Sequence, residues 1–116
     1  LLYPAFVLAE QANELFASAE EIPDTYYFLW MYVGRAYFEP LMGYDIYSEI
    51  GAYKRDVLLI HGDADSIVPL SSSQRALESY PSAELKVING GGHGFYGADA
   101  QQTVNDMLEY FAEHRI

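Results

Sequence analysis

The sequence predicts an α/β fold in which short parallel strands alternate with helices. Four consecutive apolar residues at 57–60, β-branched at both ends, indicate a strand that is buried on both faces. A helical pattern follows at 71–80, then a second short strand at 85–88 and a last amphipathic helix from about residue 99. Because strand, helix, strand and helix alternate, the strands should be parallel and joined by a right-handed crossover.

Composition limits the partners of the chain. It has 116 residues, 51% of them hydrophobic, so it forms one domain or part of one and can build a core. The chain has 6 Lys and Arg residues against 17 Asp and Glu residues, a net charge of −11. This charge repels phosphate backbones and anionic lipid, so we expect neither a nucleic-acid nor a membrane partner.

The chain contains no cysteine, so a thiolate nucleophile is excluded. The longest apolar run, at 26–33, is too short to span a membrane, and we expect a cytoplasmic protein.

The first half of the chain is less regular. Residues 1–3 resemble the end of a buried strand, and apolar residues at helical spacing predict a helix over 8–19 that Ile22-Pro23-Asp24 ends. Aromatic residues then crowd 26–38, where the periodicity does not distinguish helix from strand. Asp45 should cap a short helix that runs through Ile50.

Caps and an apolar stripe are also predicted in the second half. Ser71 should cap the helix to residue 80, and Asp99 with Gln102 the last helix. One stripe of the last helix should pack on the sheet: Ala100, Val104, Met107, Leu108 and Phe111.

Two loops at the carboxyl ends of the predicted strands, 63–69 and 89–97, carry the ionisable residues, and ligands bind at this edge of such sheets. Asp65 and His93 can form an acid and base pair there, the carboxylate accepting the Nδ1 proton of the imidazole while Nε2 takes a proton from a hydroxyl nucleophile. Spacing alone supports a second interpretation equally well, in which His93 is a turn residue that hydrogen-bonds to the backbone.

Two other readings of these loops are weaker. Gly92-x-Gly94-x-x-Gly97 matches a dinucleotide fingerprint in letters, but no strand with an acidic residue follows it, so the glycines more simply give the backbone freedom around His93. A metal site at His61, Asp63, Asp65 and His93 lacks a diagnostic spacing, and we expect no metal and no cofactor.

Both loops carry a family resemblance. Residues 61–69, His-Gly-Asp-Ala-Asp-Ser-Ile-Val-Pro, match the H-G-x-x-D-x-x-V-P signature of α/β-hydrolases, and residues 91–95 match their G-x-H-G-F loop. The chain resembles the C-terminal part of one such domain: about three strands of the parallel sheet with flanking helices, a cap at about 9–55, acid and histidine loops at 61–97, and a helix at about 99–114. This resemblance implies that Asp65 is the acid of a catalytic triad and His93 its base.

A narrower resemblance concerns the substrate. Ile22-Pro23-Asp24-Thr25 and Tyr44-Asp45-Ile46-Tyr47 are similar to cap segments of bacterial carboxylesterases of the cinnamoyl and feruloyl esterase type. The resemblance implies hydrolysis of small carboxylic esters, including aromatic acyl esters. The aromatic stretch can be plain core or can supply stacking walls, and we expect four residues to contact substrate: Phe28, Trp30, Tyr32 and Val68.

The chain contains no G-x-S-x-G nucleophile elbow. We therefore expect it to be a fragment that supplies Asp and His but is inactive alone. The serines at 66 and 71–73 are better explained as turn and cap residues, His61 as a loop hydrogen-bonding residue, and Asp63 as a turn residue that could replace Asp65. His114 should complement the dipole of the last helix.

Alternative functions stay open at this point. One is a non-catalytic interaction module on the hydrolase fold, and another is a hydrolase of a different bond, such as a peptide or lactone, or a haloperoxidase. We also expect homo-oligomers through the sheet edge at 1–3, which would be exposed.

Overall fold

The computed structural model describes residues 1–115. The chain divides into two compact units. One unit comprises Leu1–Phe6 together with the chain from Tyr47 onward, and the other is Val7–Ile46. Among the described residues, no helix combines the length and the apolar character that a membrane crossing requires.

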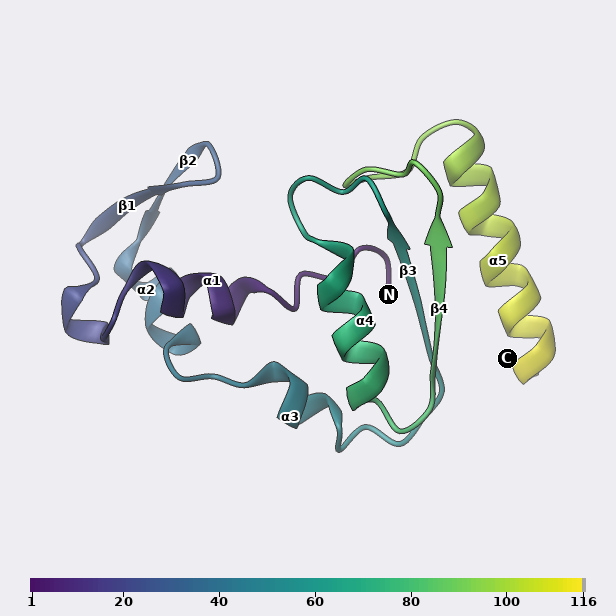
Figure 1. Ribbon diagram of the computed structural model, residues 1–116, viewed down its shortest axis with the longest axis horizontal. Coiled ribbons are helices and arrows are strands. Elements are labelled where there is room, and N and C mark those ends of the chain that lie inside the picture. Colours follow the sequence, from purple (N-terminus) through teal and green to yellow (C-terminus); the bar gives the residue numbers. More distant parts are fainter. Residues whose placement is uncertain (116) are drawn as a thin grey trace. The chain divides into compact units, whose positions relative to one another are not determined.

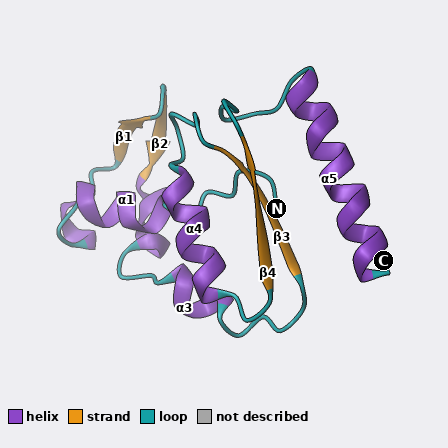
Figure 2. Ribbon diagram, turned by 45° about the vertical axis from the view of Figure 1, so that its right-hand side comes forward, coloured by secondary structure: helices purple, strands orange, loops and turns teal. Residues whose placement is uncertain are grey.

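A parallel pair of strands forms the centre of the first unit, as predicted. β3 (Val57–Gly62) pairs with β4 (Ala83–Ile88), in register from Val57 opposite Ala83 to Gly62 opposite Ile88. All six residues of β3 are buried. The helices α4 (Leu70–Ser79) and α5 (Ala98–His114) lie on opposite sides of this pair (Figures 1 and 2). The predicted α/β class is confirmed.

The amino-terminal residues occupy the other edge of β3. Leu2 forms a parallel bridge with Ile60, the carbonyl of Leu1 accepts the Ile60 N–H at 2.9 Å, and Tyr3 N donates to the Ile60 carbonyl at 2.8 Å. Residues 1–3 therefore follow the path of a third parallel strand, as predicted, but Leu1 and Leu2 are exposed rather than buried on both faces.

The helix caps differ from the prediction. α4 begins at Leu70, one residue early, and its N-cap is Pro69, so Ser71 lies inside the first turn. α5 begins after Gly97, whose φ of +57° suits glycine, and no side chain caps it, so the predicted Asp99 cap is wrong. By contrast, α3 (Ile46–Ile50) begins directly after Asp45 as expected.

The face that α5 packs on the sheet also differs from the prediction. Thr103 and Tyr110 are its buried residues. Of the predicted contacts, Met107 packs on the same core, whereas Val104, Leu108 and Phe111 are exposed. The Thr103 hydroxyl donates to the Asp99 carbonyl at 2.9 Å, so this partly polar face can be buried with its hydroxyl satisfied. Tyr110 joins a core that contains Leu58, Ile60 and Ile88.

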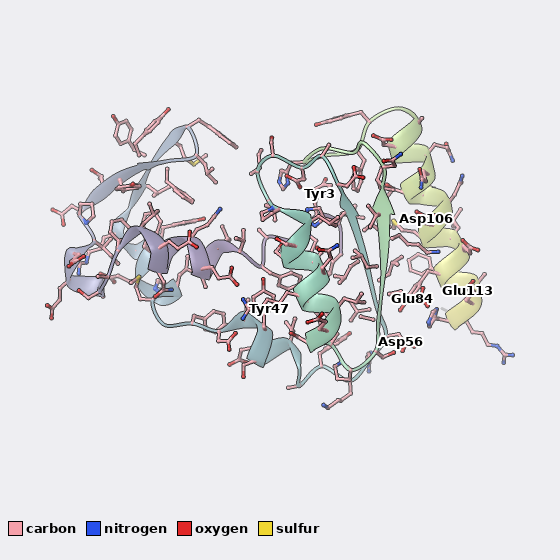
Figure 3. All side chains as sticks on the ribbon, viewed as in Figure 1. Tyr3, Tyr47, Asp56, Glu84, Asp106 and Glu113 are labelled. Atoms are coloured by element: carbon pink, nitrogen blue, oxygen red, sulfur yellow. The ribbon has the colours of Figure 1, made fainter. Side chains whose placement is uncertain are left out.

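Helix α3 is held to α4 by an aromatic contact. The guanidinium of Arg75 lies 4.0 Å from the centre of the Tyr47 ring, a cation–π geometry. Figure 3 labels Tyr47 on this helix. This contact belongs wholly to the first unit and anchors the segment that leads into β3.

The second unit is built from short elements: α1 (Leu8–Leu15), the 3₁₀ turn η1 (Ala19–Glu21), β1 (Thr25–Phe28), β2 (Met31–Gly34), α2 (Arg35–Phe38) and the 3₁₀ turn η2 (Glu39–Leu41). The predicted helix to residue 19 is too long. It ends at Leu15 because Phe16 is extended and turns its ring into the aromatic core, 5.2 Å from the rings of Tyr26 and Phe38.

An antiparallel hairpin explains the ambiguous aromatic stretch. β1 and β2 pair from Thr25 opposite Gly34 to Phe28 opposite Met31. The two loop residues, Leu29 and Trp30, both have positive φ, 46° and 62°. Such hairpin turns normally contain Asn or Gly, so the sequence carries no turn signal here.

Candidate active site

The two loops of interest leave the carboxyl ends of β3 and β4 side by side. Ala64 N donates to the Gly91 carbonyl at 2.9 Å, Asp63 N to the Ile88 carbonyl at 3.2 Å, and Gly90 N to the Asp63 carboxylate at 2.6 Å. Asp63 therefore links the two loops by hydrogen bonds, which agrees with the prediction that it is a turn residue bonded to backbone N–H groups. The three bonds fix the position of one loop against the other.

Close backbone contact between the loops depends on Gly62, the last residue of β3. A Cβ atom at Gly62 would lie 2.0 Å from the Gly91 carbonyl oxygen, so no larger residue fits without moving the backbone. Gly94, directly after His93, has a φ of +126°, a conformation that glycine adopts most easily. The glycines around His93 thus have the conformational role predicted from the sequence.

Gly62→Ala should lower the free energy of unfolding by about 3 kcal/mol or more, because the new methyl group overlaps backbone that cannot move freely. The matched control is Gly92→Ala, since a Cβ there would meet nothing within 4 Å. Urea unfolding followed by circular dichroism measures both variants. Equal stabilities for the two would contradict the contact.

Asp65 and His93 meet at the end of the sheet. The Asp65 carboxylate oxygen Oδ2 lies 2.9 Å from Nδ1 of His93. The Asp65 side chain is fully buried (0% exposed), whereas that of His93 is 29% exposed. The other oxygen, Oδ1, accepts the backbone N–H groups of Ile67 at 2.9 Å and Val68 at 2.8 Å. The loop backbone thereby anchors Oδ1, the oxygen that does not contact the imidazole.

These bonds also decide the charge of Asp65. Burial raises the pKa of its carboxyl, but the hydrogen bonds from Val68 N–H, the His93 ring and Ile67 N–H together outweigh burial, so the pKa lies below the ordinary value of 3.8. Asp65 is therefore ionised near neutral pH. An ionised acceptor requires a proton on Nδ1 of His93, and in a neutral ring this leaves Nε2 able to accept one.

Two further residues, for which the sequence predicted no contact with the site, lie beside it. The ring of Tyr3 lies 4.9 Å from that of His93 and 5.1 Å from that of Phe95, and Tyr3 has a φ of +34° (Figure 3). Ser73 of α4 contacts Nδ1 of His61 at 2.6 Å. Tyr3 could have been found from the predicted strand end. Ser73 was predicted as one of the cap residues of the helix, but it lies inside α4 and bonds to His61, for which the run of serines gives no signal.

Comparison with known proteins agrees with this geometry. Residues 40–115 match the abhydrolase family model described as TAP-like protein. The chain belongs to the α/β-hydrolase family. Two relatives named as the carbamate hydrolase RutD are similar to this hydrolase chain: one from Caulobacter sp. (strain K31) is 36% identical over 81% of the chain, and one from Caulobacter vibrioides (strain NA1000 / CB15N) is 32% identical over 97%.

Solved structures of α/β-hydrolases also resemble the chain. Est1E from Butyrivibrio proteoclasticus superimposes with a TM-score of 0.80 at 26% identity, over 96% of the chain. A second Est1E structure, with ferulic acid bound, has a TM-score of 0.84 at 24% identity. The chain spans 34% and 40% of the two RutD relatives and 50% and 47% of the Est1E chains, so it corresponds to half or less of each.

The predicted substrate residues of this hydrolase chain lie in different environments. Val68 is 4% exposed, and its carbonyl contacts His61. Phe28 is half-buried, with its ring 5.4 Å from Phe38 in the core of the second unit. Trp30 and Tyr32 are exposed on the hairpin. Their contact with substrate stays a prediction.

The hypothesis of a metal site in the two loops has no support from their geometry. Within residues 1–115, no group of three or more His, Asp or Glu side chains is arranged to hold a metal ion. Both ring nitrogens of His61 already have protein partners, and Asp63 is engaged with the Gly90 N–H.

Proposed function

We propose that this chain supplies the acid and the base of a serine-hydrolase triad that cleaves carboxylic esters, with the nucleophilic serine contributed by sequence outside these residues. The observation that carries the proposal is the 2.9 Å hydrogen bond between the buried Asp65 carboxylate and the partly exposed His93 imidazole. The polypeptide that contains both this chain and the serine is called the parent hydrolase below.

The chemistry follows from the proton positions. Nε2 of His93 accepts the proton of the serine hydroxyl while the serine oxygen attacks the ester carbonyl, and Asp65 stabilises the imidazolium that forms. The same Nε2–H then protonates the departing alcohol, which leaves an acyl-enzyme. Water attacks the acyl group with His93 again as base, and the acid is released with the serine restored.

Aromatic acyl esters are the substrate class we propose. Est1E, which shares this fold, has been solved with ferulic acid bound. The second unit of this chain carries exposed rings at Trp30 and Tyr32, and planar acyl groups stack well on such rings.

Carbamate hydrolysis is a second candidate, favoured by the similarity to RutD. A serine attacks the carbonyl of a carbamate as it attacks that of an ester, so the same acid and base serve both. The ratio of kcat/KM for a methyl cinnamate-type ester to that for a matched aryl carbamate separates the two: the proposal expects the ester to be preferred.

The 116-residue chain alone should not hydrolyse p-nitrophenyl butyrate above the rate in buffer, because it contains no G-x-S-x-G nucleophile elbow whose serine the pair could activate. The parent hydrolase should hydrolyse it, and a fluorophosphonate should block that turnover. Fluorophosphonate-sensitive turnover by the chain alone would contradict the assignment of the nucleophile. A folded parent hydrolase that cleaves neither ester nor carbamate would favour a non-catalytic interaction module.

A further inference from the structure

His61 is buried where three parts of the site meet. It lies in β3, its side chain is 0% exposed, and it contacts both α4 and the loop that carries Asp65. Nε2 is 2.9 Å from the Val68 carbonyl and 3.1 Å from Asp65 Oδ2, while Nδ1 is 2.6 Å from the Ser73 hydroxyl. A fully buried ring with all these contacts has one orientation only.

The partners decide where the ring proton sits. The Val68 carbonyl and the ionised Asp65 can only accept, so Nε2 must carry a hydrogen that the two oxygens share. The Ser73 hydroxyl can donate to Nδ1, which satisfies a neutral ring completely. The two acceptors at Nε2 thus fix the tautomer in which His61 donates to Asp65, and the Ser73 hydroxyl, which rotates to donate, gives Nδ1 the partner that this tautomer requires.

One oxygen of Asp65 therefore receives two imidazole donors. Oδ2 accepts from Nε2 of His61 and from Nδ1 of His93, whereas Oδ1 accepts two backbone N–H groups. The backbone bonds alone leave Oδ2 free to pivot about the Oδ1 anchor. A second donor from the rigid end of β3 removes that freedom.

The geometry points to His61, fixed by Ser73, as a positioning residue that holds Asp65 Oδ2 on the Nδ1–H of His93. This role rests on the proposed function where it concerns turnover, but the hydrogen bond itself can be measured without turnover. His61 does not touch the reacting atoms and acts only through Asp65.

The first test is an NMR measurement on the ¹⁵N-labelled 116-residue chain. The Nδ1–H proton of His93 should be visible far downfield, because a carboxylate accepts it, and should be lost to solvent exchange in Asp65→Asn. His61→Leu fills the same space without a donor and should also lose or broaden this signal. His61→Gln places an amide donor near the position of Nε2 and should restore it.

The second test repeats these variants in the parent hydrolase. His61→Leu should lower kcat by about 10- to 100-fold with KM unchanged within about twofold, because a small misplacement of the pair is costly. His61→Gln should recover most of kcat. If the parent hydrolase shows no turnover, the proposed function fails while the NMR result still decides the role of His61.

Circular dichroism checks that each variant is folded. If His61→Leu does not fold, Ser73→Ala decides instead: it leaves the ring in place but removes the partner of Nδ1, and should weaken the His93 signal and lower kcat by about threefold. A folded His61→Leu with an unchanged His93 signal and kcat would overturn the inference. So would a His61→Gln that fails to rescue, since packing rather than a donor would then be responsible.

Discussion

Replacing His93 with alanine in the parent hydrolase should lower kcat for ester hydrolysis by about 10⁴- to 10⁶-fold, the range seen when a triad base is removed. The physical reason is that no other described side chain combines a hydrogen bond to the buried Asp65 carboxylate with an exposed ring edge. KM should change little, because the ring acts on the proton rather than on substrate affinity. Steady-state kinetics with p-nitrophenyl butyrate measures both constants.

His114→Gln is the control for this prediction. His114 lies at the end of α5, where Nδ1 bonds the Tyr110 carbonyl at 2.8 Å and the ring stacks on that of Tyr110 at 3.9 Å. Its loss should leave kcat within about twofold. A His93→Ala enzyme that keeps more than a hundredth of its turnover would remove His93 from the role of base.

The strands and the two loops could be predicted because each depends on a local signal. Val57 to Ile60 is apolar without alternation, which is typical of a strand buried on both faces, and β3 is buried throughout. Parallel strands bring their carboxyl ends to one edge, so Asp65 and His93 were expected to meet and do so. Spacing and topology predicted this contact, but they left His93 equally explicable as a turn residue, and only the resemblance of the two loops to α/β-hydrolase signatures assigned the acid and base roles.

The features that were missed depend on tertiary contacts. The hairpin turn at Leu29 and Trp30 adopts positive φ without Asn or Gly, and only pairing of the flanking strands explains it. The buried face of α5 follows Tyr110 and Thr103 rather than the most apolar stripe, since the sheet selects the face. The bond between Ser73 and His61 joins two elements and leaves no periodic trace in sequence.

Asp65→Asn should lower kcat of the parent hydrolase by about 10⁴-fold. An amide in this place can present its NH₂ group to Nδ1 of His93, which favours the tautomer with the proton on Nε2 and so removes the base. Asp63→Asn is the matched control two residues away: its carboxylate only braces the Gly90 N–H, and kcat should stay within about threefold. Equal losses in the two variants would mean that Asp65 acts through loop structure alone.

The same substitution should change how stability depends on pH. The pKa of Asp65 is lower in the folded chain than its ordinary value of 3.8, so the ionised carboxylate favours folding above about pH 4. That contribution is lost as the pH falls from about 4 through the lower pKa of the folded state. Asn at this position does not titrate, and the other carboxyl groups are common to both proteins. The difference in unfolding free energy between wild type and Asp65→Asn, measured by urea unfolding at about pH 7, 5 and 3, should therefore shrink at the lowest pH. If the difference in unfolding free energy widened as the pH fell, folding would raise the pKa of Asp65. Burial would then outweigh the four hydrogen-bond donors around the carboxylate.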